Sequence, residues 1–520
     1  MLSFITPDGI ANPLPVWSYP FLLFLTWYTF TAFTTWYRLR HVPGPFLASF
    51  SYAWYVYQAL TGRIGPAFQS LNRYGPLVRT APNYVVTSDP EVLRRIGSAR
   101  SKWVRDDWYK AARFHSEYDN MATIIDNDEH DRMKAKTASA YSGREDGAGL
   151  EPAVDEQIVR LKGLIRRKLL SPAAGGSEVV KPVDVSRLMR FFTLDVITRL
   201  GYGKPFGYLD EGTDVYGWIE MIDKRVLIIS LPLEVPLLRR IMFSPYGIEK
   251  FGPQITDKTG VGKVMGIVNK IVTERFQSGE KHNDMIGGFI RNGMSQQEVE
   301  GEALLQLFAG SDTTANALTA AVVSLATAPR AYARLKHEIR DAIKSGHVDA
   351  HQPITLEQAQ KLPYLQAVIY ESFRIRNPVN HGHYKLVPPP GETFHGIYLP
   401  PGTAVGHNTL ALTRNRAIFG HDADVYRPER FFRTEYKPGM TYDEIELDTD
   451  RIKALDIVFG GGRWTCSGKH VAMVELNKVI FELMRDFDFQ FVDPQKGWDE
   501  VHYLVPRFKN LRMFITEAEG

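Results

Sequence analysis

The feature that most constrains this 520-residue chain is a long apolar segment that contains no helix-breaking proline. Ser295-Gln296-Gln297-Glu298 has the form of a capping box, which starts a helix, and the next proline is Pro329. A helix over 296–327 would be about 48 Å long, which is enough to cross a whole domain. Because its leucines and valines make it so apolar, it must be largely buried. We therefore expect a mainly α fold with smaller β-sheets.

The centre of this predicted helix, Ala309–Thr314, contains residues that do not suit a buried helix. Gly310 at mid-helix costs about 1 kcal/mol relative to alanine. Serine and threonine hydroxyls there can bend a helix by bonding back to its carbonyls. Asp312 must find partners or shift its pKa. Such local conflicts are typical of a functional site, although a polar notch facing the surface is an alternative.

The single cysteine of the chain, Cys466, lies in the sequence FGGGRWTCSGKHVA, residues 459–472. One cysteine excludes an intrachain disulfide framework and a multi-cysteine zinc site. The glycines 460–462 allow positive φ and a close backbone approach to a flat ligand. Apolar residues recur from Ala472 onward at helical spacing, so the thiol would lie just before a helix N-terminus, which favours a thiolate. Three interpretations stay open: an inert core residue, a nucleophile with His470 as its base, or a metal ligand.

Charged residues in two further segments could meet in the fold. A predicted helix from Thr355 to about Arg376 places Glu371 and Arg374 on one helix face, close enough to pair. Arg430, within Pro428–Phe431, could reach the same carboxylate. A glutamate with two arginine partners would form a structural clamp between distant segments through charge-assisted hydrogen bonds.

The amino-terminal region has the pattern of a membrane anchor. No charged residue occurs from Gly9 to Tyr37, and this length can span a bilayer core of about 30 Å. Arg38 and Arg40 follow, which places the next domain on the cytosolic side. A cleaved signal peptide is disfavoured because no basic residue precedes the run and no small-x-small cleavage site closes it. Aromatic residues suited to the membrane interface lie near both ends: Trp17, Tyr19, Trp36 and Tyr37.

These patterns divide the chain into a transmembrane anchor over 1–40, a proline hinge over 41–45 and one large domain over 46–520. No linker or low-complexity tract divides the chain after residue 45. Hydrophobic residues make up 44% of the chain, which is enough for a large core. The net charge of +3 is too small to imply nucleic-acid binding.

The motifs together resemble the cytochrome P-450 superfamily of haem-thiolate monooxygenases, over about residues 43–517. Its oxygen-activating helix is similar to Ala309–Thr314, and its Glu-x-x-Arg and Pro-Glu-Arg-Phe motifs follow in the same order. Segments 203–207 and 358–366 look like the fungal pisatin-demethylase-like branch. The haem loop of the family is matched by Phe459, Gly462, Cys466 and Gly468.

The resemblance implies haem b, iron protoporphyrin IX, as the cofactor, with Cys466 as the iron ligand. It implies that Asp312 and Thr313 relay protons during dioxygen activation, while Ala309 and Gly310 leave room over the ring. One position departs from the family, since Trp464 stands where a basic residue usually binds a haem propionate. The residues implied to take over this task are Arg463 and, on a predicted helix over 128–138, His130 and Lys134.

The resemblance also implies a function and partners. We expect oxidation of a lipophilic small molecule in fungal secondary metabolism, a terpenoid or a polyketide. The alternatives are a haem-thiolate isomerase or dehydratase that needs no dioxygen, a xenobiotic-detoxifying demethylase, and a carrier or sensor without catalysis. The intact Asp312–Thr313 pair disfavours the isomerase and the carrier.

Electrons would come from an NADPH-cytochrome reductase, with cytochrome b5 as a second candidate donor. The reductase would dock near the cysteine loop on Arg463, Lys469 and Lys478, unless these form a merely solvated basic face. The expected location is the endoplasmic reticulum membrane, single-pass, with a cytosolic catalytic domain. The implied pocket walls are 104–119, 304–311, 377–384 and 503–507, in which His381 and His383 are expected to face solvent or backbone.

Overall fold

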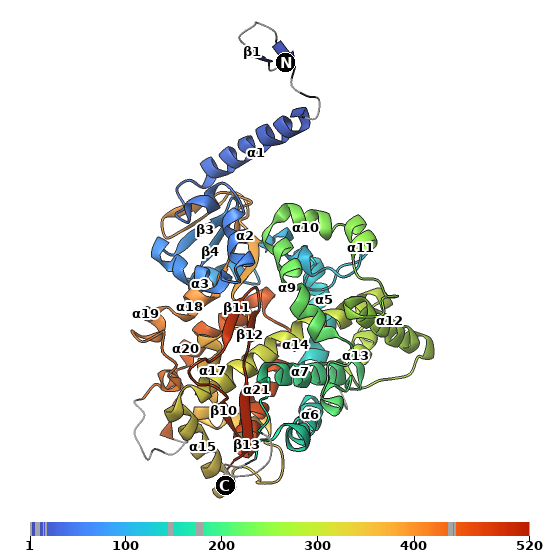
Figure 1. Cartoon of the computed structure of the whole chain (residues 1–520), viewed down its shortest axis with the longest axis vertical. Coiled ribbons are helices and arrows are strands. Elements are labelled where there is room, and N and C mark those ends of the chain that lie inside the picture. Colours follow the sequence, from blue (N-terminus) through green and yellow to red (C-terminus); the bar gives the residue numbers. More distant parts are fainter. Residues whose placement is uncertain are drawn as a thin grey trace.

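The computed structural model describes residues 3–5, 11–13, 15, 18–143, 149–172, 180–434, 440 and 444–518. Helices make up most of the body and the sheets are small, so the predicted mainly α fold is confirmed (Figure 1). The helices are α1 Ser18–Leu39, α2 Ala53–Leu60, α3 Ile64–Gln69, α4 Pro90–Gly97, α5 Asn127–Ser142, α6 Leu150–Leu164, α7 Val185–Tyr202, α8 Tyr208–Glu211, α9 Trp218–Glu234, α10 Pro236–Met242, α11 Pro245–Phe251, α12 Gly260–Ser278, α13 Met285–Arg291, α14 Gln296–Ala326, α15 Pro329–Lys344, α16 Leu356–Gln360, α17 Pro363–Ile375, α18 Thr409–Thr413, α19 Arg416–Phe419, α20 Thr449–Leu455 and α21 Lys469–Asp486. The strands are β1 Ser3–Ile5, β2 Ala11–Pro13, β3 Leu77–Ala81, β4 Tyr84–Thr87, β5 Val104–Arg105, β6 His381–Leu386, β7 Glu392–Phe394, β8 Ile397–Leu399, β9 Ala404–Asn408, β10 Phe487–Phe491, β11 Asp499–His502, β12 Pro506–Lys509 and β13 Met513–Glu517.

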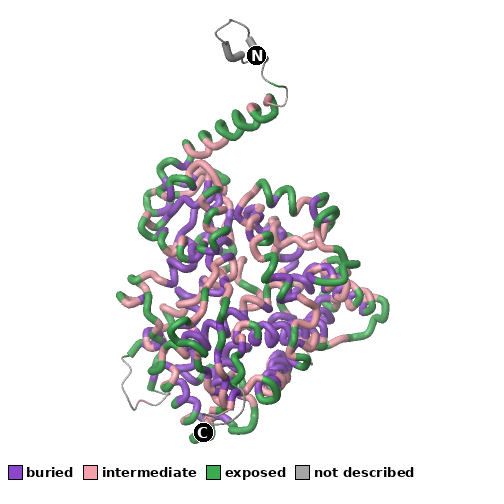
Figure 2. The backbone as a smooth tube through the Cα atoms, viewed as in Figure 1, coloured by how far each residue is buried: buried purple, intermediate pink, exposed green. Residues whose placement is uncertain are grey.

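The predicted central helix is α14, and its bounds confirm the prediction. The side chain of Ser295 accepts a hydrogen bond from the backbone N–H of Glu298, and the Glu298 side chain accepts one from the N–H of Ser295. This capping box satisfies two backbone donors at the helix start. The helix packs against α7, α12, α17 and α21, so most of its surface is buried, as its composition requires (Figure 2).

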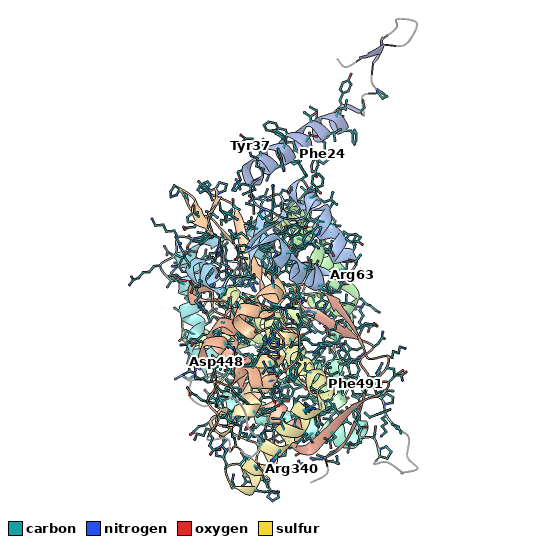
Figure 3. All side chains as sticks on the ribbon, turned by 90° about the vertical axis from the view of Figure 1, so that its left-hand side faces the viewer. Phe24, Tyr37, Arg63, Arg340, Asp448 and Phe491 are labelled. Carbon is teal, nitrogen blue, oxygen red and sulfur yellow. The ribbon has the colours of Figure 1, made fainter. Side chains whose placement is uncertain are left out.

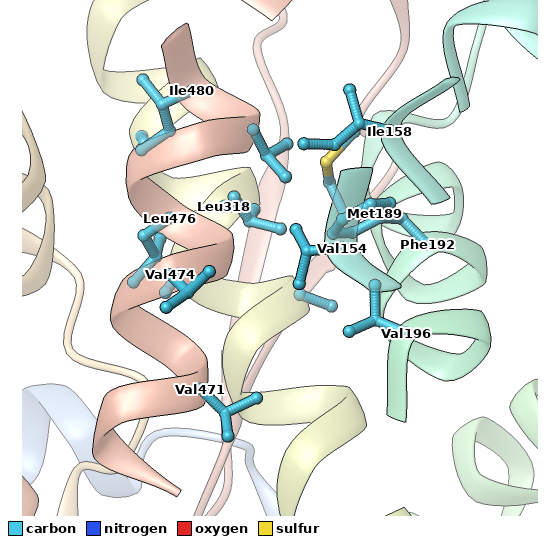
Figure 4. Close-up of a cluster of buried hydrophobic side chains, with 14 of the residues drawn as sticks. Val154, Ile158, Met189, Phe192, Val196, Leu318, Val471, Val474, Leu476 and Ile480 are labelled. Atoms are coloured by element: carbon cyan, nitrogen blue, oxygen red, sulfur yellow. The ribbon is translucent and has the colours of Figure 1, made fainter. Parts of the chain in front are cut away.

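The hydrophobic core beside α14 is formed by α21, α6 and α7 (Figure 4). On α21, Val471, Val474 and Ile480 are at most 5% exposed. Val471 and Val474 are three positions apart and lie on the side of α21 that faces Val154 of α6, whereas Ile480 lies on the other side of the helix. This packing fixes the position of the cysteine loop, because the loop leads directly into the first turn of α21.

The single helix predicted over 355–376 is wrong, because the structure divides it into α16 and α17. Pro363 occupies the first turn of α17, where its missing N–H and fixed φ are tolerated. The residue before a proline is disfavoured in helical conformation, so α16 ends and a new helix begins. The buried start of α17 is capped by Glu338 of α15, which accepts the N–H groups of Tyr364 and Leu365 at 2.8 Å each.

A five-stranded sheet, in the order β3-β4-β9-β6-β5, forms a second layer at one side of the helices. Strands β4 and β9 are parallel, and the other neighbours are antiparallel. The β6–β9 pairing shifts register between Gly382 and Lys385. His383 has a positive φ of 56° there, and a Cβ on Gly382 would lie 2.6 Å from Trp108. This bulge re-aims the side chains of the following residues.

Helix α1 projects away from the body, and its aromatic side chains, including Phe24 and Tyr37, are exposed (Figure 3). In the part of the chain that the structure describes, no helix has both the length and the hydropathy needed to cross a membrane. This corrects the prediction of a transmembrane helix within residues 1–40. The physical reason lies in the composition of α1, where threonines, tyrosines and tryptophans alternate with leucine and phenylalanine. Trp17, a predicted interfacial anchor, lies outside the described residues.

A buried carboxylate in α14 predicts a pH-dependent stability. Burial raises the pKa of Glu302 to about 7; its Oε1 accepts the N–H of Met121, and its Oε2 has no partner. An unfolded chain loses this proton near pH 4.3, so the free energy of unfolding falls by about 4 kcal/mol as the pH rises through this window. Replacing Glu302 with glutamine removes the titration. The midpoint of thermal unfolding should therefore match that of the native protein at pH 4 and exceed it at pH 8. An equal difference at both pH values would contradict the assignment.

Candidate functional site

A cavity with a volume of about 360 Å³ lies between α14 and α21. Its lining includes residues of α5, α14, β6, β9 and the cysteine loop over 458–468. Three of the four predicted walls contribute, namely 104–119, 304–311 and 377–384. No residue of 503–507 belongs to its described lining. Segments far apart in sequence thus meet around one cavity.

The glycines of the cysteine loop serve the loop itself more than a ligand. Gly460 and Gly462 have positive φ values of 79° and 57°, as their sequence predicts. A Cβ on Gly462 would lie 2.1 Å from the carbonyl oxygen of Gly97 in α4. A Cβ on Gly460 would lie 2.4 Å from the carbonyl oxygen of Trp464. Of the three glycines, Gly461 has open space beside it, and it lines the cavity with Gly460.

The thiol of Cys466 faces the cavity, and its backbone N–H donates to the carbonyl of Phe459 at 2.7 Å. Phe459 and Gly468 also line the cavity, whereas Gly462 and Arg463 do not contribute to its described lining. Burial raises the pKa of the thiol above its ordinary value, although the N–H groups of Gly468 and Lys469 favour the thiolate. The sequence predicted that the helix N-terminus favours a thiolate, but this effect alone does not deprotonate the thiol here. Coordination to a metal ion would deprotonate the thiol outright.

The opposite wall of the cavity is the centre of α14. Ala309, Gly310 and Thr313 line it. Thr313 Oγ1 donates to the carbonyl of Ala309 at 2.7 Å, which is the back-bonding expected of a hydroxyl in a helix. A Cβ on Gly310 would lie 3.2 Å from Ile197, so this glycine also permits close packing of α14 on α7.

Asp312 does not line the cavity but lies in a cage of two arginines beside it. Its Oδ1 accepts from Arg190 Nε at 3.0 Å, and its Oδ2 accepts from Arg507 at 2.7 Å. Arg190 also binds both carboxylate oxygens of Asp223 at 2.8 Å. The two guanidinium groups hold the pKa of Asp312 well below its usual range, in spite of its burial. Asp312 is therefore ionised at neutral pH, and it is not the solvated surface notch considered as an alternative.

A group of cationic and aromatic side chains lines another edge of the cavity, and sequence reasoning missed most of it. The Trp464 ring lies 4.6 Å from the Arg105 guanidinium carbon and 4.8 Å from Lys385 Nζ. Lys385 Nζ donates to the hydroxyl of Tyr109, and both residues line the cavity. Arg105 and Lys385 occupy no recognisable motif, and a cross-strand pairing that the sequence does not reveal brings them together.

The three residues predicted to replace the basic group at position 464 lie close to Trp464 but have other partners. Lys134 Nζ donates to the carbonyls of Arg463 and Thr465 at 2.7 Å each, so it holds the loop. The Arg463 guanidinium lies 2.9 Å from Asp131. His130 packs 4.7 Å from the Trp464 ring, and burial lowers its pKa to about 4, which leaves it neutral.

The two histidines of the β6 segment were expected to face solvent or backbone, but His381 is buried and His383 is half-buried, and both contact other side chains. His383 lines the cavity with its ring 5.3 Å from that of His407, and burial lowers both pKa values. His381 instead bonds Glu234 of α9 at 2.8 Å, outside the cavity lining described.

The predicted basic docking surface is corrected at Lys478. This side chain is 1% exposed and pairs with Glu151 and Asp155 at 2.9 and 3.0 Å, so it presents no charge to a partner. Lys469 lies at the surface but pairs with Asp456 at 2.9 Å. With Arg463 paired as well, the loop region offers no unpaired cation from the predicted set.

The structure brings together the three residues of the expected clamp. Arg374 donates to both oxygens of Glu371 at 2.7 and 2.8 Å, and Arg430 Nε donates at 2.9 Å. All three side chains are fully buried. The remaining guanidinium N–H groups bind carbonyls, including those of Thr413 and Val425. The clamp thus joins α17 to the segment 413–430. It lies away from the cavity, so its role is structural.

The cavity has requirements that a ligand must meet. The thiol of Cys466 offers a soft ligand to a metal ion, and the apolar wall of α14 faces it. Arg105 and Lys385 offer two buried positive charges, and Arg105 Nε has no partner. A flat apolar group with a central metal ion and two carboxylates at one edge fits this arrangement.

Comparison with known proteins assigns this arrangement to a family. Residues 45–508 match the cytochrome P450 family. The chain is 42% identical to the cytochrome P450 monooxygenase ABA1 of Pyricularia oryzae, over 96% of this chain and 97% of that protein. It is 43% identical to the cytochrome P450 monooxygenase aba1 of Botryotinia fuckeliana, over 93% and 92% of the two chains. It is 29% identical to pisatin demethylase of Fusarium vanettenii, over 93% and 92%.

Proposed function

Because the chain belongs to the cytochrome P450 family of monooxygenases, we propose that it binds haem b through Cys466 and oxidises a lipophilic small molecule of fungal secondary metabolism, a terpenoid or a polyketide. The observation that supports this most is the cavity itself, which sets the thiol of Cys466 across from Thr313. The full-length relatives are fungal monooxygenases, and one more distant relative is named a demethylase of pisatin.

The residues around the cavity divide the work of holding haem. Cys466 would bind the iron, Phe459 would pack beside the loop, and Arg105 and Lys385 would bind the propionates. When bound, haem supplies the redox chemistry that inserts one atom of dioxygen into the substrate. Electrons would come from an NADPH-cytochrome reductase, with cytochrome b5 as a second donor.

Proton transfer is the part of the reaction that belongs to the chain. Thr313 Oγ1 holds a proton that it shares with the carbonyl of Ala309, and it can turn that proton into the cavity. Asp312, the adjacent residue, is ionised and cannot store a proton at neutral pH. Its role is to attract protons from solvent toward the hydroxyl, and Arg190 and Arg507 fix its position. An isomerase or dehydratase would need no such pair.

The replacement of Thr313 by alanine tests the proton relay. We expect NADPH consumption to continue while the fraction of electrons recovered in product falls by about tenfold or more, with hydrogen peroxide released instead. The control is Thr313→Ser, which keeps the hydroxyl and should keep most of the coupling. The measurement is product and peroxide per NADPH oxidised, in the reconstituted system with a reductase. Full coupling in the alanine variant would reject the role of Thr313.

We also propose that the protein works at the cytosolic face of the endoplasmic reticulum membrane. Large apolar side chains are exposed on α1, on the turn over 46–49 and on α10, at the same end of the molecule (Figure 1). Such a surface suits contact with a lipid interface. Fractionation of cells that express the protein would test this, since recovery in the soluble fraction would contradict it.

A further inference from the structure

Two buried cations face one tryptophan at the edge of the cavity. Arg105 and Lys385 are register partners on the antiparallel strands β5 and β6. Like charges placed directly opposite on neighbouring strands repel each other. Here the repulsion is strong, because both residues are buried, at 8% and 3% exposure. The fold would not keep this pair without something that attracts both cations.

No carboxylate in the described part of the chain forms an ion pair with either cation. Arg105 donates to the carbonyls of Met121 and Ile124 at 2.6 and 2.9 Å. Lys385 donates to the hydroxyl of Tyr109 and to the carbonyl of His383. These partners are neutral, so each cation is hydrogen-bonded but has no carboxylate within ion-pair distance in the described part of the chain. Burial accordingly lowers the pKa of both side chains.

The Trp464 ring is the group that both cations share. Arg105 lies 4.6 Å and Lys385 4.8 Å from its centroid, within the range of a cation–π interaction. Tryptophan offers the strongest such attraction of the aromatic residues. A basic side chain in place of Trp464 would instead put a third positive charge beside the other two. The indole at position 464 therefore fits the charges around it, although it departs from the family pattern.

We propose that Trp464 is a positioning residue: its ring holds Arg105 and Lys385 at the cavity edge, and these two cations bind the haem propionates in place of the usual basic group at position 464. The inference rests on the haem site of the proposed function. The competing candidates are engaged elsewhere, since Arg463 pairs with Asp131 and Lys134 bonds the loop carbonyls. The positive charges that bind the propionates therefore lie on the β5–β6 pair and not on the cysteine loop.

The first test compares Trp464→Leu with Trp464→Phe. Leucine fills space without a π-face, whereas phenylalanine keeps one. We expect haem to leave the Trp464→Leu holoenzyme about tenfold to a hundredfold faster than the native protein, and Trp464→Phe to stay within about threefold. The rate is measured by haem transfer to excess apomyoglobin. The haem reduction potential should also fall in Trp464→Leu, because displaced cations no longer offset the propionate charges. Native rates and potential in this variant would overturn the proposal.

A second test separates positioning from space-filling. In a Lys385→Met background one of the two cation–π contacts is already lost, so Trp464→Leu should accelerate haem release less than it does in the native background. We expect the two acceleration factors to differ by at least about threefold. An equal factor in both backgrounds would mean that the indole merely fills space, and it would overturn the proposal.

Trp464→Arg provides a further variant if Trp464→Leu does not fold. It restores the usual basic group, yet it should release haem faster than the native protein, because it adds a third cation. Tighter haem binding in Trp464→Arg would contradict the inference. Failure of the native protein to bind thiolate-ligated haem would reject the proposed function instead, so the two failures are distinguishable.

Discussion

Replacing Glu371 with glutamine is expected to lower the free energy of unfolding by about 3–5 kcal/mol, since it leaves the fully buried Arg374 guanidinium without a counter-ion and removes one of the two carboxylates that pair with Arg430. Glu371 Oε1 alone accepts from Arg374, from Arg430 and from the backbone N–H of Arg427. A glutamine can replace one acceptor but brings no charge. Arg430 keeps a partner in Asp422, whereas Arg374 keeps carbonyls as its hydrogen-bond acceptors.

The measurement is denaturant unfolding of the holoenzyme, with haem absorbance as a second signal. The matched control is Arg433→Gln, which breaks an ion pair with Glu446 whose side chains are 49% and 61% exposed. That change should cost less than about 1 kcal/mol. A Glu371→Gln protein as stable as the control would show that the clamp is dispensable.

Replacing Cys466 with serine is expected to abolish substrate oxidation, to below about a hundredth of the native rate. Serine is nearly isosteric and keeps the backbone N–H bond to Phe459, but its hydroxyl is a poor ligand for iron and donates little electron density. The assay is product formation with NADPH and a reductase, normalised to bound haem.

His470→Ala is the control for this experiment. His470 is exposed on the first turn of α21, outside the described cavity lining, and would matter only if Cys466 were a nucleophile with a histidine base. We expect native turnover in this variant. Equal losses in both variants would favour the nucleophile over the metal ligand.

The sequence could predict those parts of the site that are formed by residues close together in the chain. Glu371 and Arg374 are three residues apart on one helix, so their pairing follows from helix geometry. The capping box of α14 and the loop before α21 are likewise local patterns. Thr313 and Cys466 could be placed in one site only through resemblance to a family.

The parts that sequence missed depend on pairings between distant segments. Arg105 meets Lys385 through the β5–β6 register, and the bulge at Gly382 and His383 sets which side chains reach the cavity. A one-residue slip of a strand would reverse these faces, and no local pattern fixes the register. Lys478 was misjudged for a similar reason, since its acidic partners lie on α6, more than 300 positions earlier.

The central claim is that the Cys466 thiolate is the haem ligand, and the absorption spectrum of the reduced, carbon monoxide-bound protein tests it most directly. Thiolate ligation shifts the main band strongly to the red of the position that a neutral ligand gives. We predict this red-shifted band in the native protein and in His470→Ala, and its loss in Cys466→Ser. A native protein without that band, or a Cys466→Ser protein that retains it, would contradict the account.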